Sequence, residues 1–188
     1  MPVSIPQGIE QGIQWVTEVN PRSVLDVGIG FGLWGFLCRM YLDVFQGRFK
    51  KSDWLTRIDG VECFKDYIQP HQQWLYSALH IGKAEELLPA LDHYDVVIFG
   101  DVLEHIDSPQ CLEVLDQGVS LANQAVVLRL PIGPGWEHGV CYDNEQEVHR
   151  SVWAPDSLNA YEPEYRFYTC GRLAYMLACI RKGEGADA

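Results

Sequence analysis

Apolar positions repeat with two different periods along the chain. Residues 7–19 place apolar side chains three or four positions apart, which predicts a short amphipathic helix that ends at Asn20-Pro21. From residue 23 onward, short apolar runs alternate with helical patterns. The expected strands are 23–28, 57–62, 79–82, 94–100 and 125–131, and the expected helices are 33–45, 66–78 (interrupted by Pro70) and 109–122. This alternation predicts βαβ units and a parallel sheet covered on both faces.

The last part of the chain departs from this alternation. A long polar, aromatic-rich segment follows Pro131 and is expected to form a loop region over residues 132–163. Two further runs, 165–169 and 172–182, are separated only by Cys170-Gly171, and so short a link favours an antiparallel hairpin. The second run is rich in Leu and Ala and also fits a helix, although the strand is favoured. The expected α/β fold is a mostly parallel twisted sheet with helices on both faces and a C-terminal antiparallel hairpin.

Length and composition set the broad class of protein. A chain of 188 residues fits one domain, here 1–182, with a helix inside its first 20 residues and a frayed, disordered tail at 183–188. A formal net charge of −12 opposes binding to a phosphate backbone, so no nucleic-acid partner is expected. Neither a signal peptide nor an apolar run long enough to span a bilayer is evident.

The cysteines indicate the redox environment. Six of them are scattered without a CxxC pair, which argues against a zinc site or a disulfide scaffold. Free cysteines that behave as small hydrophobic residues suit a reducing compartment. We therefore expect a cytoplasmic protein with no membrane partner, and the sequence leaves its oligomeric state open.

Residues 23–35 read SVLDVGIGFGLWG, with four glycines in the last eight positions. A strand that runs into a glycine-rich turn and then a helix forms a nucleotide site, because bare backbone and the N–H groups of the first helical turn face the ligand. Residues 30–35 fit the dinucleotide pattern GxGxxG, whereas residues 26–32 fit [D/E]xGxGxG. Asp26 discriminates between them: a carboxylate beside a diphosphate would repel it by on the order of several kcal/mol, and would attract a sulfonium.

The pattern at residues 26–32 resembles the first motif of class I S-adenosylmethionine (SAM)-dependent methyltransferases, and the resemblance extends over most of the chain. It implies a Rossmann-like fold and SAM as the cofactor. It also implies that Asp26 approaches the methionine part of the cofactor and that Gly28, Gly30 and Gly32 form its loop. Glu62, at the end of the second strand, would accept hydrogen bonds from both ribose hydroxyls.

One position departs from the family pattern. Residues 81–87 (IGKAEEL) occupy the place of a "GDA" turn whose acid usually accepts the adenine amino group, and Lys83 stands where that acid would be. Lysine has only donors, so backbone groups around Lys83 and Ala84 would read the adenine, or Glu85 would replace the missing acid. This departure keeps open the alternative of a cofactor-binding module without catalysis.

The methyl acceptor is expected beside the ends of the fourth and fifth strands. Residues 93–106 (HYDVVIFGDVLEHI) resemble the fourth family motif, as in small-molecule methyltransferases of the ubiquinone-biosynthesis type, and place Asp101 where it would touch cofactor and acceptor. Candidate bases are Asp101, His105 and His149, with Glu104 and His138 as further polar groups. His149, Ser151 and Trp153 share a face only if their segment is extended. No tight ligand spacing such as HExxH is present, so no metal site is expected, and metal binding by His105 beside Glu104 is the lesser alternative.

Together these features predict an enzyme that transfers a methyl group from SAM to a small-molecule acceptor, with an oxygen on a metabolite or sugar as the first hypothesis. Methyl transfer from a sulfonium is an in-line displacement, so the protein chiefly aligns the acceptor and excludes water. An NAD-dependent oxidoreductase is the enzymatic alternative, against which Asp26 argues. A non-catalytic SAM-binding module is the alternative from another class.

Overall fold

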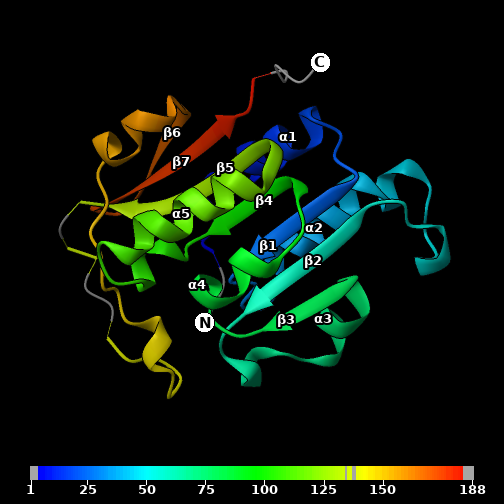
Figure 1. Ribbon diagram of the computed structural model, residues 1–188, viewed down its shortest axis with the longest axis horizontal. Helices are drawn as coiled ribbons and strands as arrows, with labels where there is room; N and C mark the ends of the chain where they lie inside the picture. Colours follow the sequence, from blue (N-terminus) through cyan, green and yellow to red (C-terminus); the bar gives the residue numbers. More distant parts are fainter. Residues whose placement is uncertain (1–3, 134, 137–138, 184–188) are drawn as a thin grey trace.

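One seven-stranded sheet organises the chain in the computed structural model, which describes residues 4–133, 135–136 and 139–183 (Figure 1). The strand order is β3-β2-β1-β4-β5-β7-β6. The first five strands pair in parallel, and β7 is antiparallel to both β5 and β6. The strands are β1 (Ser23–Val27), β2 (Arg57–Glu62), β3 (Ala78–Ile81), β4 (Tyr94–Gly100), β5 (Ala122–Ile132), β6 (Glu164–Cys170) and β7 (Leu173–Arg181). The predicted sheet and its C-terminal antiparallel hairpin are confirmed, and residues 173–181 form a strand rather than a helix.

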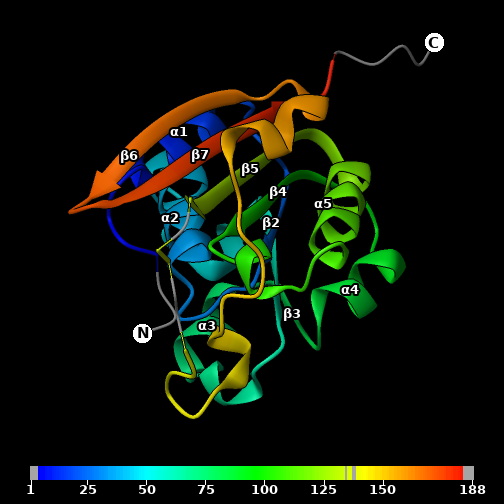
Figure 2. The same ribbon diagram turned by 90° about the vertical axis from the view of Figure 1, so that its left-hand side faces the viewer.

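Helices cover both faces of this sheet (Figure 2). Apolar side chains of α1 (Ile9–Glu18), α2 (Leu33–Leu42) and the end of α3 (Pro70–Leu75) form one core with Val24, Ile58 and Ile98 of the strands. On the other face, α4 (Ala84–Leu87) and α5 (Gln110–Leu121) pack against Leu25, Val27 and their neighbours. Successive strand residues thus enter opposite cores, as the two-residue period of a strand requires.

Some local elements differ from those expected. Pro70 does not interrupt a longer helix; it occupies the first turn of α3, where its missing N–H leaves no hydrogen bond unmade. The expected helix over 33–45 ends at Leu42, and a 3₁₀ turn, Val44–Gln46, follows it. Helix α4 was not expected, because its four residues are too few to show a period. No helix among the described residues is long and apolar enough to cross a bilayer.

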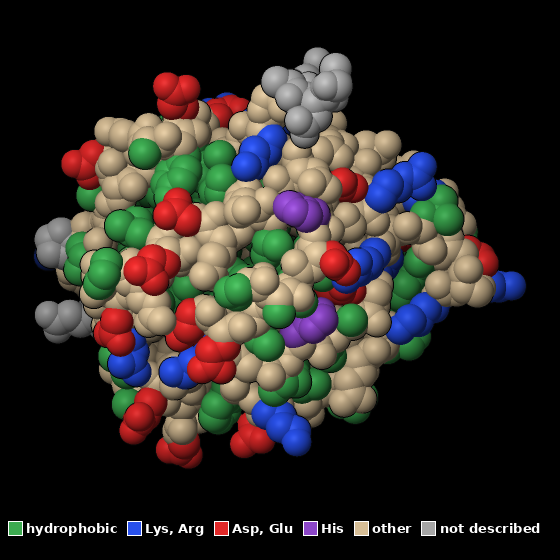
Figure 3. All heavy atoms as spheres, viewed as in Figure 1, with side chains coloured by type: hydrophobic (Ala, Val, Ile, Leu, Met, Phe, Trp, Pro, Cys, Tyr) green, Lys and Arg blue, Asp and Glu red, His purple; other side chains and the backbone are tan. Residues whose placement is uncertain are grey.

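The segment between α2 and β2, residues 43–56 and called the insertion below, is organised around one buried acid, Asp43. Its carboxylate accepts hydrogen bonds from Arg39, from Nε of Arg48 at 2.7 Å and from the N–H of Leu55 at 2.8 Å. Burial alone would raise the pKa of Asp43, but these donors outweigh it and hold that pKa below its ordinary value. Lys and Arg side chains gather at the end of the face where this insertion lies (Figure 3). The net negative charge of the chain is therefore not spread evenly over this face.

Gly35 of α2 lies against Tyr76, and the contact predicts a measurable effect on stability. A Cβ built on Gly35 would stand 2.3 Å from the phenol oxygen of Tyr76, which is itself 2 % exposed. We expect Gly35→Ala to lower the free energy of unfolding by about 1–3 kcal/mol, because overpacking outweighs the better helix propensity of alanine. Urea denaturation measures this change.

The matched control is Gly139→Ala, where the added Cβ meets no atom within 4 Å. Equal stability of the Gly35→Ala variant and the wild type would show that Tyr76 is free to move away.

Candidate functional site

A cavity of about 490 Å³ opens at the carboxyl ends of the parallel strands. This is the edge at which ligands bind in open α/β sheets, beside the point where the strand order reverses between β1 and β4. The volume lies within the range of small-molecule sites. Eight of the residues predicted for the site line it: Gly28, Gly30, Glu62, Lys83, Ala84, Asp101, His105 and His149.

The glycine loop after β1 has a backbone that only glycine adopts without strain. Gly28, Gly30 and Gly32 have φ angles of 71°, 49° and 89°, all in the left-handed region. At Gly28 a side chain is excluded both by the positive φ angle and by sterics, because a Cβ there would stand 2.3 Å from Val102. Gly28 and Gly30 face the cavity, whereas Gly32 is the N-cap of α2 and does not line it.

Asp26 lies behind the loop rather than in the cavity. It alternates with Leu25 and Val27, so its side chain enters the core under α2 and α3. There one carboxylate oxygen, Oδ2, accepts the N–H of Gly35 at 3.0 Å and the hydroxyl of Tyr76 at 2.6 Å. Burial raises the pKa of Asp26 to about 7 despite these two donors. Asp26 is thus not among the residues that line the cavity, and its carboxyl group holds α2 and Tyr76 behind the loop, so its approach to the cofactor stays a prediction.

Glu62, by contrast, reaches the cavity from the end of β2. Its carboxylate accepts the N–H of Gly30 at 2.9 Å and the N–H of Phe64 at 2.8 Å. Burial raises its pKa, and the backbone donors oppose that effect. Glu62 therefore joins the glycine loop to the turn after β2 while its carboxylate lines the cavity.

The turn after β3 supplies the next wall. Lys83 is the N-cap of α4, with its Nζ 4.0 Å from Oε1 of Glu85, and Ala84 is buried at the first helical position. Gly82, Lys83, Ala84 and Glu85 all line the cavity. The position that carries an acid in the family pattern is thus occupied by a half-exposed ammonium beside an acid two residues later.

Asp101 follows β4 in a left-handed conformation, with φ 58°. Its N–H donates to the carbonyl of Arg129 at 2.9 Å, and its carboxylate forms an ion pair with the buried Arg129 guanidinium. That guanidinium also lies 4.1 Å from the ring centroid of Tyr175. Burial raises the pKa of Asp101, while Arg129 and Ser4 oppose the shift. Sequence reasoning missed Arg129, although a single arginine inside the apolar run 125–131 was the available signal.

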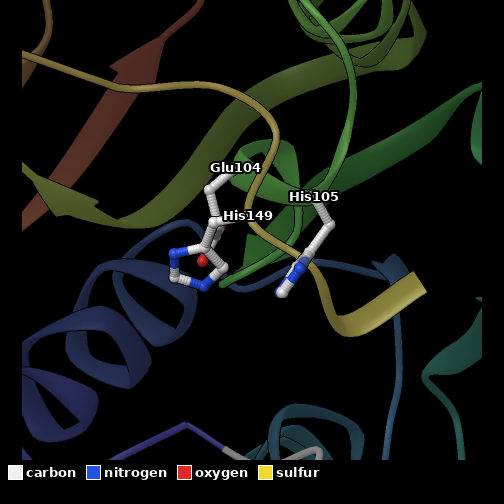
Figure 4. Close-up of side chains that lie close together, drawn as sticks. All are labelled: Glu104, His105 and His149. Atoms are coloured by element: carbon white, nitrogen blue, oxygen red, sulfur yellow. The ribbon is translucent and has the colours of Figure 1, made fainter. Parts of the chain in front are cut away.

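Glu104, His105 and His149 form a compact polar cluster, and all three line the cavity (Figure 4). One potential ligand atom from each of the three lies within 4.8 Å of the others, and the imidazole centroids are 4.8 Å apart. Glu104 is 1 % exposed, and burial together with the nearby Asp101 raises its pKa well above the ordinary value. The first two residues belong to the turn after β4, and the third to the loop after β5.

Backbone hydrogen bonds hold this loop against that turn. The carbonyl of Glu104 accepts the N–H of Arg150 at 2.7 Å and that of Ser151 at 3.1 Å. The Ser151 hydroxyl lies 3.0 Å from the carbonyl of Leu103 and accepts the indole N–H of Trp153 at 3.0 Å. Trp153 is buried and forms a bridge to Ile132 of β5. Ser151 and Trp153 therefore anchor the segment, and His149 is the member that faces the cavity.

Other residues close the cavity and were not singled out from the sequence. The Tyr67 hydroxyl lies 2.8 Å from Oε1 of Glu147 and accepts from Nδ2 of Asn144 at 3.2 Å, so the turn after β2 meets the loop after β5. Trp136 lines the cavity as well. These contacts join residues about 80 positions apart, which no sequence spacing reveals. His138, a further candidate base, lies outside the described residues.

Comparison with known proteins finds matches only among solved structures; no family model and no curated protein matches the chain. A SAM-dependent methyltransferase from Archaeoglobus fulgidus is 17% identical with a TM-score of 0.66, covering 93% of this chain and 92% of that one. Magnesium protoporphyrin IX methyltransferase from Synechocystis PCC 6803 with bound SAH is 13% identical with a TM-score of 0.65, covering 94% and 83%. An O-methyltransferase family protein from Burkholderia thailandensis is 12% identical with a TM-score of 0.57, and the match covers 94% of this chain but 58% of that protein.

At these identities the likeness establishes the fold. The chain has the Rossmann-like fold of SAM-dependent methyltransferases, with the antiparallel β6–β7 hairpin at the edge of the sheet. The resemblance predicted from the glycine motif is confirmed at that level.

The buried Asp26 predicts a pH dependence of stability. Between about pH 4 and pH 7 this carboxyl is protonated in the folded chain and ionised in the unfolded chain, so raising the pH favours unfolding. The amide of the Asp26→Asn variant retains an oxygen that accepts from Gly35 and Tyr76 but does not titrate. We therefore expect the stability of the wild type relative to Asp26→Asn to fall by on the order of 1 kcal/mol per pH unit across that window.

Urea unfolding of both proteins at several pH values measures the difference. Asp92→Asn, at an exposed acid, is the control for the loss of a charge. A difference between wild type and Asp26→Asn that stays constant with pH would contradict the assignment.

Proposed function

We propose that this chain transfers a methyl group from SAM to a small-molecule acceptor. The observation that carries the proposal is the cavity itself, in which the glycine loop and Glu62 face Asp101 and the Glu104, His105 and His149 cluster. The fold supports it, since structures that share the fold are named as methyltransferases, one of them with bound SAH. A cofactor half and an acceptor half thus share one volume.

The residues of the cofactor half fit an adenosine that carries a sulfonium. Gly28 and Gly30 expose bare backbone to the cavity, and the Glu62 carboxylate beside them has lone pairs for a ribose diol in addition to its two backbone donors. Backbone groups at Lys83 and Ala84, with Glu85 close by, would contact the adenine. When bound, SAM supplies an activated methyl group and a thioether leaving group.

The charge of the cavity favours this cofactor over NAD. Among the described lining residues, six are acidic (Glu62, Glu85, Asp101, Glu104, Asp107 and Glu147) and three are basic (Lys83, Arg129 and Arg150). Arg129 is already paired with Asp101, and Lys83 lies beside Glu85. A diphosphate would meet an excess of carboxylates, whereas a sulfonium cation is attracted by them. These acids therefore disfavour a dinucleotide. Asp26 does not contribute, because it faces away from the cavity.

The acceptor is proposed to lie between Asp101 and the two histidines. Asp101 is fixed by Arg129, so it can orient a polar group of the acceptor at a defined position. His105 and His149 are within reach of the same region, and either imidazole can receive the proton of an acceptor hydroxyl as the new bond forms. An oxygen nucleophile on a metabolite or sugar is the acceptor that this basic pair suits.

Bound cofactor and acceptor would displace water from the cavity. Trp136, Tyr67 and Glu147 line it, and the loop is fixed to the turn after β4 through the Glu104 carbonyl. Since the leaving group is already activated, alignment and a dry site account for most of the acceleration that such a protein supplies. An acceptor that shares about 490 Å³ with the cofactor must be small, or enter by one end.

Calorimetry tests the cofactor assignment. We expect the chain to bind SAM and S-adenosylhomocysteine and not NAD. Glu62→Gln should weaken binding of S-adenosylhomocysteine about 10- to 100-fold, because it removes a charged acceptor of ribose hydrogen bonds. Glu86→Gln, at an exposed acid of the same charge outside the cavity lining, should leave the affinity unchanged. Binding of NAD with no binding of S-adenosylhomocysteine would overturn the proposal in favour of an oxidoreductase.

Turnover with an acceptor found by screening separates an enzyme from a binding module. We expect His149→Ala to lower kcat at least about 100-fold while the affinity for S-adenosylhomocysteine changes less than about twofold, because the ring lies at the acceptor end. Transfer of labelled methyl groups measures kcat, and calorimetry measures affinity. Undiminished kcat in His149→Ala would exclude the imidazole from the chemistry, and a wild type that binds SAM but methylates no oxygen-containing acceptor would favour the module.

A further inference from the structure

The Glu104, His105 and His149 cluster contains an acid whose environment is incomplete. The Oε2 atom of Glu104 is buried in the cavity wall and has no hydrogen-bond partner among the described residues. Burying a carboxylate oxygen without a partner is costly, so native structures rarely leave one unmatched. Two imidazoles, those of His105 and His149, lie close to Glu104. A ligand that accepts electron pairs from oxygen and nitrogen would complete this arrangement.

Both histidines are oriented in the way that metal ligands require. Nδ1 of His105 lies 3.3 Å from the carbonyl of Val148, and Nδ1 of His149 lies 2.8 Å from the carbonyl of Trp136. A carbonyl can only accept, so in each neutral ring Nδ1 carries the proton and Nε2 carries the lone pair. Metal-binding histidines are held by this second contact, which fixes both the tautomer and the direction of the ring.

From these observations we infer that Glu104, His105 and His149 bind one divalent transition-metal ion, with a further coordination position open toward the acceptor. Two imidazoles and one carboxylate form a ligand set of the catalytic zinc type, which leaves a fourth position for water or substrate. Imidazole ligands favour Zn²⁺ or Co²⁺ over Mg²⁺, which prefers an all-oxygen shell. Tetrahedral ligands at about 2.1 Å from an ion lie about 3.4 Å apart, so the three groups, now within 4.8 Å of one another, would have to draw closer on binding.

The surrounding charges also favour a dication. Asp101 and Glu147 both act on Glu104, and Arg129 is the cation that opposes them. Arg129 is engaged with Asp101, and a dication would displace the proton that burial favours on Glu104 and so add this carboxylate to the acids around it. No sequence spacing showed this set, because His149 is 44 positions from His105 and meets it only through the loop clamped on the Glu104 carbonyl.

With both imidazole lone pairs on the ion, the ion and not a histidine base would activate the acceptor, and only this part of the inference rests on the proposed function. A hydroxyl at the open position has a lowered pKa and loses its proton to solvent. Its oxygen then forms the new O–C bond as the C–S bond of SAM breaks, and the electron pair of that bond returns to sulfur as a neutral thioether. Atoms and charge balance with no oxidant or reductant.

Titration with Co²⁺, followed by its visible absorption, tests the site on the chelator-treated chain without any cofactor. We expect one Co²⁺ per chain, displaced by Zn²⁺ and not by Mg²⁺. His149→Ala and, independently, Glu104→Gln should weaken binding at least about 10-fold. His93→Ala removes an exposed histidine outside the cavity lining and should change nothing. Cys63→Ser tests whether the exposed thiol that lines the cavity captures the ion instead.

Two outcomes overturn the inference: no retained Co²⁺, or binding that survives both His149→Ala and Glu104→Gln. Circular dichroism shows whether each variant is folded, and the thermal shift that Zn²⁺ gives the wild type provides a reading independent of the variants. Calorimetry with S-adenosylhomocysteine on the same metal-free protein reports on the proposed function separately, so the two can fail independently.

Discussion

Two buried carboxylates fix the glycine loop, and the site depends on that constraint. Asp26 holds the N–H of Gly35 from beneath, and Glu62 holds the N–H of Gly30 from the neighbouring strand. Each acid loses hydration on burial, and each recovers part of that loss from donors that the loop would otherwise leave unpaired. The left-handed glycines make this geometry accessible, and the two acids select it among the many conformations that glycine permits. The loop is thereby held in one conformation at the edge of the sheet, where it lines the cavity.

Much of the fold followed from periodicity because the sheet is covered on both faces. Apolar runs such as 94–100 have few alternatives to a buried parallel strand, and the short link at Cys170-Gly171 favoured the hairpin that the structure shows, although the second run also fitted a helix. Periodicity could not predict the four-residue helix α4 or the early end of α2. They are decided by tertiary contacts, the latter by Asp43 as it gathers donors from the insertion.

The site was accessible from the sequence only where it lies on the sheet. Gly28, Gly30, Glu62 and Asp101 follow directly from strand ends, and the structure brings them to one cavity. Alternation along β1 also contained the information that Asp26 points under α2, since Leu25 and Val27 enter the opposite core. The acceptor half is different. Tyr67, Asn144, Arg129 and the loop that carries His149 depend on hydrogen bonds between segments 28 to 80 residues apart, and local pattern carries no trace of them.

The ion pair between Asp101 and Arg129 divides the cavity electrostatically. Asp101 has its counter-charge within the wall, with the Tyr175 ring packed against the guanidinium, so it is suited to hold a neutral polar group in place. Glu104, three residues later, has no such partner on Oε2 among the described residues and lies beside two imidazoles. Under the proposed function, this turn would let Asp101 position the acceptor while Glu104 takes part in activating it. Burial favours the protonated form of Glu104, and the proposed sulfonium or metal ion would supply the cation that stabilises its carboxylate.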